Sequence, residues 1–423
     1  MLNSQRHLST PFYLLLSLPA TAMGFALSVQ IATLSWILST QFNLEIYQIG
    51  FVWAAGPLAG IVGQVLVGLI SDKVWFWRGR RRPFILIGGS LAALMLAALP
   101  NLAQLQSMLG MMDIVIVALF VALTLDLAIN ISFNPTRTLI ADVTPQGEQR
   151  TKGYTWMQTI SGFFGVLAYL IGASWGNIEL IYLSVFVVLA FSLLPTLLIT
   201  EPRQLHHSSD EDKPLPRAKA ADWPQLIKLY VAHGFSWLGV QSMFVYFIFY
   251  LNDRLVPLGY DNTGQLIGYS FAILNTVGFI VPALVLLPLS RRFGRVPVHA
   301  GCMALMAIGY FAMVPMVSSP VSLYLLMAVV GIGWGSVVSL PFAIMSEKAD
   351  PARMGFFMGI FNLSVVLPQL VVSMLFGLLL NQFADKAVLF VLCGSCLALS
   401  ALCWCLVREN ASSVVVTQAP ASH

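Results

Sequence analysis

The sequence predicts an all-α integral membrane protein with twelve transmembrane helices in two six-helix halves. Of its 423 residues, 58% are apolar and only 9% are charged, whereas a soluble domain carries about 25% charged residues. Twelve spans of about 20 residues would use about 240 residues, and the chain holds about that many apolar residues. A transmembrane β-barrel is excluded because barrel strands alternate apolar and polar residues.

Twelve apolar runs of spanning length follow one another along the chain. The first continues to Leu38 and is therefore too long for a cleaved signal peptide, so we expect it to remain as a helix. Six runs precede a polar stretch and six follow it. We place them at 13–38, 46–70, 83–104, 113–138, 153–173, 178–199, 225–250, 264–288, 297–318, 321–345, 355–380 and 387–407.

The polar stretch between the sixth and seventh runs has the composition of a solvated linker. Residues 201–224 are rich in charged residues, serine and proline, which do not form a packed core. The sequence therefore predicts an N-terminal half at 1–200 and a C-terminal half at 225–407, joined by this linker. Residues 408–423 are expected to form a disordered tail.

Lysine and arginine are divided unequally between the two sides of the membrane. With the N-terminus inside, 19 of the 22 basic residues fall on the cytoplasmic side. Only Arg254 and Lys386 fall outside, and Arg137 lies within a span. Since cytoplasmic loops carry an excess of basic residues, both termini and the linker are expected in the cytoplasm. The predicted location is the plasma (cytoplasmic or inner) membrane, which the chain crosses several times.

The two halves repeat each other's loop chemistry. Gly79 precedes three arginines between the second and third runs, and Gly294 stands 215 residues later between arginines of the eighth-to-ninth loop. Paired six-helix halves related by an axis along the membrane normal are the plan of the major facilitator transporters. The string Gly68-x-x-x-Asp72-Lys73, with the glycine and arginines that follow, resembles the loop signature of that superfamily.

This loop cluster predicts a gate on the cytoplasmic side. The Asp72 carboxylate can accept hydrogen bonds from a helix N-terminus or from arginine, and such contacts could hold one access state. The alternative is that the arginines only fix the topology. The predicted gating residues are Asp72, Gly79, Arg80, Arg81 and Arg82.

The fourth run carries ionisable side chains inside the membrane. Asp126 lies about 13 residues from either end of its span, and a charge at mid-membrane is costly, so Asp126 is expected to face a cavity. Arg137 lies about 16 Å farther along the axis and can reach Asp126 only if Pro135 bends the helix. A buried carboxylate without a nearby cation favours its protonated form, which suits reversible proton binding. The alternative is a permanently protonated aspartate bonded to a neighbouring helix.

The same run carries a resemblance to a known family. The string from Asp126 through Asn130, Pro135 and Arg137 to Asp142 resembles the sucrose-transporter family, the glycoside–cation symporters. The resemblance implies a secondary active transporter that couples protons to uptake of a disaccharide or glucoside, of the sucrose or maltose type, by alternating access. Asp126 would take the proton. Further matches are Trp53, Gly56-Pro57, Arg80-Arg81-Arg82-Pro83-Phe84-Ile85, Trp237, Pro341-Phe342-Ala343 and Pro368-Gln369.

Neutral amides within the spans are candidates for sugar contacts. Sugar hydroxyls both donate and accept hydrogen bonds, and amide side chains match both roles. Polar bonding between helices is the competing use of these side chains. Trp237 could pack on a sugar ring or anchor at the membrane interface. The predicted substrate-binding residues are Asn130, Arg137, Gln64, Asn362, Gln369 and Trp237.

The chain also departs from the family pattern. It has Phe133 where the family has glutamine and Ile129 where the family has asparagine. The seventh run reads Phe247-Ile248-Phe249 where plant members carry two aspartates. These differences leave the choice of sugar open.

Other functional classes find little support. The sequence has no phosphate loop, nucleophile elbow or zinc signature, so it predicts neither an enzyme nor a cofactor other than the coupled proton, and no metal site. A net charge of +4 is small for nucleic-acid binding. The expected partners are a small sugar and membrane lipids, and the expected state is a monomer. An uncoupled sugar facilitator, a non-transporting sugar sensor and a drug exporter remain as alternatives.

The charge distribution predicts the location of the linker. A fluorescent protein fused at Ser209 should fold and fluoresce in the cytoplasm, and alkaline phosphatase fused there should stay inactive. An active phosphatase fusion together with a non-fluorescent fusion would show that the linker lies outside the cell, and the predicted orientation would then be reversed.

Overall fold

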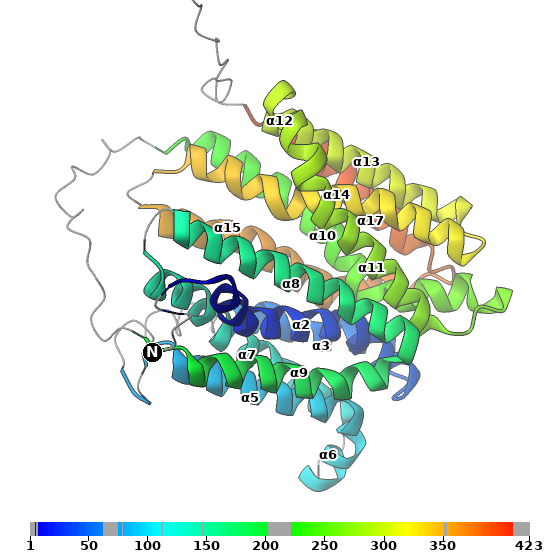
Figure 1. The fold of residues 1–423 in the computed structure, drawn as a ribbon. Coiled ribbons are helices and arrows are strands. Elements are labelled where there is room, and N and C mark those ends of the chain that lie inside the picture. Colours follow the sequence, from blue (N-terminus) through cyan, green and yellow to red (C-terminus); the bar gives the residue numbers. More distant parts are fainter. Residues whose placement is uncertain are drawn as a thin grey trace, which may run out of the picture.

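The computed structural model describes residues 5, 7–61, 75–77, 79–110, 113–145, 148–201, 221–350 and 353–408, and these form a helical membrane protein. Ten helices in the described part are long and apolar enough to cross a membrane. Shorter apolar helices at Ile46–Ile61 and Val388–Trp404 complete the predicted twelve. Figure 1 shows the helices lying side by side along one common direction. The predicted fold class is confirmed.

The N-terminal half contains six spanning elements. They are α2 (Thr10–Thr40), α3 (Ile46–Trp53) with its continuation to Ile61, α5 (Arg82–Ala98) followed by α6 (Leu102–Leu109), α7 (Ile114–Val143), α8 (Glu148–Trp175) and α9 (Asn177–Leu198).

The C-terminal half also contains six. They are α10 (Trp223–Arg254), α11 (Thr263–Val281) leading through a π-helical segment (Pro282–Leu286) into α12 (Leu287–Phe293), α13 (Arg295–Met316), α14 (Pro320–Lys348), α15 (Met354–Val371) leading through a second π-helical segment (Val372–Phe376) into α16 (Gly377–Asn381), and α17 (Val388–Trp404).

Several helices are longer than the apolar runs that predicted them. Helix α7 continues to Val143, five residues past the predicted end, and α8 begins at Glu148, five residues before the predicted start. The reason is that backbone hydrogen bonding continues into the polar interface, where the apolar pattern has already ended. Most of the predicted linker, and the predicted tail after its first residue, lie outside the described residues.

The two halves meet at one face of the membrane. Following the predicted orientation, we call the face at Thr10 and Trp223 the inner face and the face at Thr40 and Arg254 the outer face. Near the outer face, Ser35 Oγ donates a hydrogen bond of 2.7 Å to the Val245 carbonyl across the two halves. Helix α8 packs against α11, and α3 packs against the π-helical segment after α15 and against α16. These contacts close the structure at its outer face.

Gly50 allows the closest approach in this outer contact. The Tyr246 hydroxyl donates a hydrogen bond of 3.0 Å to the Val372 carbonyl, and a Cβ atom at Gly50 would overlap both that hydroxyl and the Ser373 carbonyl. Only glycine therefore fits between α10 and the chain after α15.

The Gly50→Val variant should open the outer face. Its side chain should penalise the closed contact by about 1–3 kcal/mol, the usual cost of overpacking. Distances between spin labels at Gln41 and Asn262 should therefore lengthen. Gly301→Val is the matched control, since a Cβ atom there meets open space. Equal distances in the two variants would show that the contact at Gly50 does not hold the face closed.

Candidate functional site

A central cavity of about 320 Å³ lies where the two halves meet, within the usual size range of small-molecule sites. A second cavity of about 340 Å³ adjoins it toward the inner face and shares Leu27, Phe133, Asn275 and Trp334 with it. The central cavity is lined by Leu27, Gln30, Ile31, Trp53, Gly56, Pro57, Gly60, Asp126, Ile129, Asn130, Phe133, Tyr169, Trp237, Gln241, Phe244, Asn275, Trp334, Asn362, Val365, Val366 and Gln369.

Asp126 lies in the wall of the central cavity with only 7% of its surface exposed. Its Oδ2 atom accepts a hydrogen bond of 3.0 Å from Gln30 Nε2 on α2. A Cβ atom at Gly56 would stand 3.3 Å from the same oxygen, so the backbone of the helix after α3 packs directly on the carboxyl group. None of the described residues that line this cavity is lysine or arginine. The carboxyl group is therefore held by an amide and not by a cation.

The other two predicted residues of α7 are in different places. Asn130 lines the central cavity, and its Nδ2 atom donates 2.8 Å to the Asp126 carbonyl one turn earlier. Arg137 lines the second cavity, where its guanidinium lies 4.2 Å from the centre of the Phe133 ring. Helix α7 continues through Pro135 without ending. Asp126 and Arg137 thus belong to two successive cavities.

The C-terminal half supplies a pair of amides to the central cavity. Gln369 Nε2 on α15 donates 3.2 Å to Gln241 Oε1 on α10. This bond leaves one amide oxygen and one amide nitrogen of the pair to serve a ligand, as sugar hydroxyls require. Asn362 stands seven residues before Gln369, on the same face of α15, and lines the same cavity. Gln64, the remaining predicted amide, lies outside the described residues.

Two tryptophans form an aromatic wall in the same cavity. Trp237 and Trp334 lie 6.0 Å apart with their planes at 82°. The Trp237 indole N–H donates 3.0 Å to His233 Nε2, and the Trp334 indole N–H donates 3.2 Å to Asn275 Oδ1. Both indole donors are therefore used within the protein. Trp237, predicted as a sugar contact, can offer its ring surface but not its N–H group.

Two residues that complete this site, Gln241 and Trp334, were not among the predicted ones, whereas Gln30 was one of the candidate amides within the spans. Gln30, Gln241 and Trp334 all line the central cavity. Gln241 stands one helical turn after Trp237, and that spacing could have indicated a shared face. The Gln30–Asp126 bond joins residues 96 positions apart, and no local pattern predicts such a pairing.

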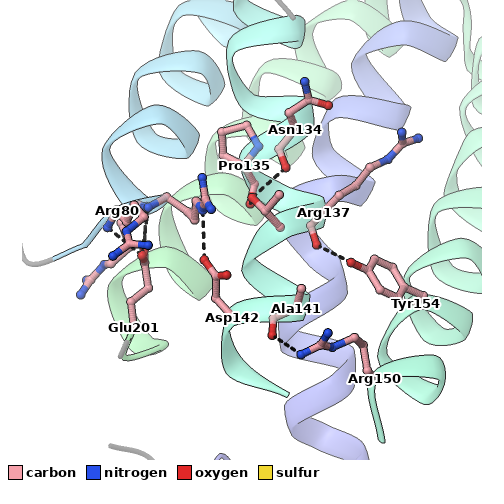
Figure 2. A network of polar contacts seen from close by, with 12 residues as sticks. Arg80, Asn134, Pro135, Arg137, Ala141, Asp142, Arg150, Tyr154 and Glu201 are labelled. Atoms are coloured by element: carbon pink, nitrogen blue, oxygen red, sulfur yellow. Dashed lines mark hydrogen bonds and ion pairs between the residues drawn. The ribbon is translucent and has the colours of Figure 1, made fainter. Parts of the chain in front are cut away.

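The predicted gating arginines form a compact network at the inner face (Figure 2). Glu201, which follows α9, accepts hydrogen bonds of 2.7–2.9 Å from the backbone N–H groups of Arg80, Arg81 and Arg82 at the start of α5. A carboxylate is favoured there because a helix N-terminus carries partial positive charge. A Cβ atom at Gly79 would stand 2.6 Å from the Glu201 carboxylate, so this loop needs glycine.

The side chain of Arg81 extends the network to α7. Its Nε atom pairs with Asp142 Oδ2 at 3.0 Å, and both side chains are almost fully buried. Arg150 donates to the Ala141 carbonyl, and Tyr154 donates to the Arg137 carbonyl (Figure 2). Arg150 also donates to the Thr144 carbonyl. The contacts named here bind α5, α7, α8 and the end of α9 into one unit within the N-terminal half. Asp72 lies outside the described residues.

Known proteins resemble this chain over most of its length. The sequence model of the Major Facilitator Superfamily matches residues 16–371. The sucrose transport protein SUT2 of Oryza sativa subsp. japonica is 24% identical over 391 residues, which cover 76% of this chain and 78% of the rice protein. The general alpha-glucoside permease of Schizosaccharomyces pombe is 28% identical over 223 residues, covering 47% of this chain and 40% of the yeast protein.

Solved structures share the fold. A mutant of the nucleoside transporter NupG superimposes with a TM-score of 0.74 at 12% identity and covers 94% of this chain and 100% of that one. The inward-open xylose transporter XylE from E. coli gives 0.70 at 17% identity, covering 95% and 96%. These structures bear on the fold alone, and the sequence relatives confirm the predicted resemblance to sucrose transporters.

The Glu201→Gln variant should weaken the inner network. The amide replaces an acceptor oxygen with a donor that faces backbone N–H groups, and we expect a loss of about 1–3 kcal/mol. Thermal unfolding of the purified protein should show a lower transition temperature. Asp261→Asn is the control, because Asp261 is an exposed acid in the loop before α11. An equal change in both variants would contradict the capping role of Glu201.

Proposed function

The chain belongs to the major facilitator superfamily, and we propose that it is a proton-coupled symporter that carries a disaccharide or glucoside by alternating access. The substrate class is suggested by the names of its relatives, which are sucrose transport proteins and an alpha-glucoside permease. The protein is a multi-pass membrane transporter and not an enzyme.

The observation that carries the proposal is the environment of Asp126. A carboxyl group is costly in the membrane interior, and such groups mark ion and substrate pathways. Asp126 is buried at the central cavity, bonded to Gln30 and without lysine or arginine among the described lining residues. A group in this position can gain a proton from cavity water and lose it again, which is the step that couples a symporter to a pH gradient.

The sugar is bound between amides of both halves. Asn130 contributes from the N-terminal half, and Asn362, Gln241 and Gln369 contribute from the C-terminal half. A ligand that bonds to both halves favours conformations in which they lie close together. Once Asp126 is protonated, its O–H group can also donate a hydrogen bond to a sugar hydroxyl. Proton and sugar then favour the same closed conformation, so they cross together.

Arg137 acts on the route to the inner face. It lines the second cavity, beyond Phe133 as seen from Asp126. Sugar hydroxyls can accept hydrogen bonds from its guanidinium after they leave the central cavity.

The loop cluster of Asp72 and Arg80 to Arg82 holds the alternate, outward-facing state, in which the inner face closes. Its support is the rigid unit that Glu201 and Asp142 build around these arginines.

The membrane location, the oligomeric state and the position of the termini are proposed from the charge distribution and the fold. We place the protein in the plasma or inner membrane as a monomer, with both termini in the cytoplasm. The proton is its coupling ion, and no other cofactor is required.

Asp126→Asn should abolish uphill transport. A one-unit pH gradient that drives one proton can support accumulation of up to about tenfold, and without a titratable group the ratio should fall to about one. Exchange of labelled sucrose for unlabelled sucrose should persist, because the asparagine amide still forms hydrogen bonds. Both are measured in the same vesicles, with and without an imposed gradient.

Asp261→Asn is the matched control, since Asp261 is exposed in the loop before α11, and it should accumulate sucrose like the wild type. If Asp126→Asn accumulated sucrose with wild-type pH dependence, the proton would bind elsewhere. If the wild-type protein exchanged sucrose but never accumulated it, the protein would be an uncoupled facilitator.

A further inference from the structure

Seven buried side-chain polar atoms of the C-terminal half have no hydrogen-bond partner among the described residues, and three of them stand on three neighbouring helices. These three are His233 Nδ1 on α10, His299 Nε2 on α13 and Trp404 Nε1 on α17. The residues are 2%, 0% and 0% exposed. Buried polar atoms in proteins are paired almost without exception, with protein atoms or with ordered water. Three unpaired polar atoms on three neighbouring helices therefore indicate one shared hydrogen-bond partner.

The three side chains lie at one level between these helices. One turn toward the outer face, Ser236 of α10 shares a hydrogen bond of 2.7 Å with Ser400 of α17 and donates 3.5 Å to Met303 Sδ of α13. His233 is three residues before Ser236, His299 is four before Met303, and Trp404 is four after Ser400. Each therefore stands one turn closer to the inner face, since α17 runs opposite to α10 and α13.

Ring contacts agree with this arrangement. The His299 and Trp404 rings lie 4.4 Å apart at 81°, and His233 stands three residues before Ser236, whose hydroxyl contacts both α13 and α17. Helix α17 packs extensively against both α10 and α13. The three side chains therefore belong to one buried layer where α17 meets α10 and α13.

The hydrogen bonds already present decide which of these atoms donate. His233 Nε2 accepts from the Trp237 indole, so the proton of the His233 ring is on Nδ1, which must donate. Trp404 Nε1 can only donate. His299 Nδ1 lies 2.7 Å from Ser336 Oγ, and if this nitrogen donates to the serine, His299 Nε2 is an acceptor.

We propose that a single buried water molecule binds between His233, His299 and Trp404. It accepts hydrogen bonds from His233 Nδ1–H and Trp404 Nε1–H and donates one to His299 Nε2. Three hydrogen bonds are the usual number for a buried water, and this set satisfies all three orphaned atoms at once.

The water completes a chain that leads to the substrate cavity. The chain runs from Trp237 through His233, the water and His299 to Ser336. Trp237 belongs to the aromatic wall of the cavity, and Ser336 stands two residues after Trp334, the other tryptophan of that wall. His299 is thus a positioning residue for the aromatic wall, a role that rests on the proposed transport function.

The first test needs no transport. Histidine labelled with ¹⁵N is observed by solid-state NMR in lipid bilayers, and His233→Gln and His299→Gln assign the two signals. We expect one proton on Nδ1 of each ring and transfer of magnetisation from water to both. A proton on His299 Nε2, which would instead suit an anion, or no transfer from water to either ring would overturn the proposal.

The second test concerns the aromatic wall. His299→Leu removes the acceptor, and we expect the KM for labelled sucrose to rise about three- to tenfold, while the maximal rate stays within about twofold. His299→Gln keeps an acceptor oxygen and should restore KM to within about twofold of the wild type.

Tyr310→Phe is the matched control. Tyr310 is on the same helix, and its hydroxyl is likewise buried without a partner among the described residues, but it lies well beyond the water layer. Its KM should not change. An equal rise in KM in Tyr310→Phe and His299→Leu would reduce the role of His299 to packing. Absence of uptake of sucrose, maltose and other glucosides by the wild type would contradict the transport function and leave the NMR result to decide on the water.

Discussion

The hydrogen bond between Gln30 and Asp126 joins the first helix to the fourth at the centre of the molecule. In the membrane interior bulk water is absent, so each polar group must find its partner in the protein or in a cavity. A carboxyl group placed there requires both a donor and a space from which protons can reach it. Much of the central site meets these two needs, because amides fix the polar groups and the cavity leaves one side of them open.

The same constraint explains where charged and neutral polar groups lie in the two halves. In the N-terminal half, charged groups gather at the inner face, where Glu201 and Asp142 bind the start of α5 and the Arg81 side chain. In the C-terminal half, Lys348 and the Arg295–Glu347 ion pair likewise lie at the inner face, whereas neutral groups such as Ser236 and Ser400 pair between helices deeper in the membrane. The free-energy cost of burying a neutral hydrogen-bonded pair in the membrane core is small, whereas ion pairs lie at the edge of the core, where water is near.

Sequence patterns predicted the transmembrane helices and their order, but they did not predict which side chains form hydrogen bonds between helices. Long apolar runs predicted twelve spans because membrane thickness fixes the length of an apolar helix, but they ended α7 at 138 where the helix continues to Val143. Asp126 stood out because a charge within an apolar run is rare. Its partner Gln30 could not be predicted, because amides occur in many spans and only the packed helices decide which two meet. The Gln241–Gln369 pair was missed for the same reason.

Phe133 marks the point where this chain departs from the sucrose-transporter pattern, which has glutamine there. The structure places its ring in the walls of both cavities, with the Arg137 guanidinium over its face. An amide at this position would extend the polar surface from Asn130 toward the inner cavity. The phenyl ring interrupts that surface and separates the carboxyl group at Asp126 from the cation at Arg137 by an apolar step. The two ionisable groups of α7 therefore lie in successive cavities, and no polar side chain at this position connects them.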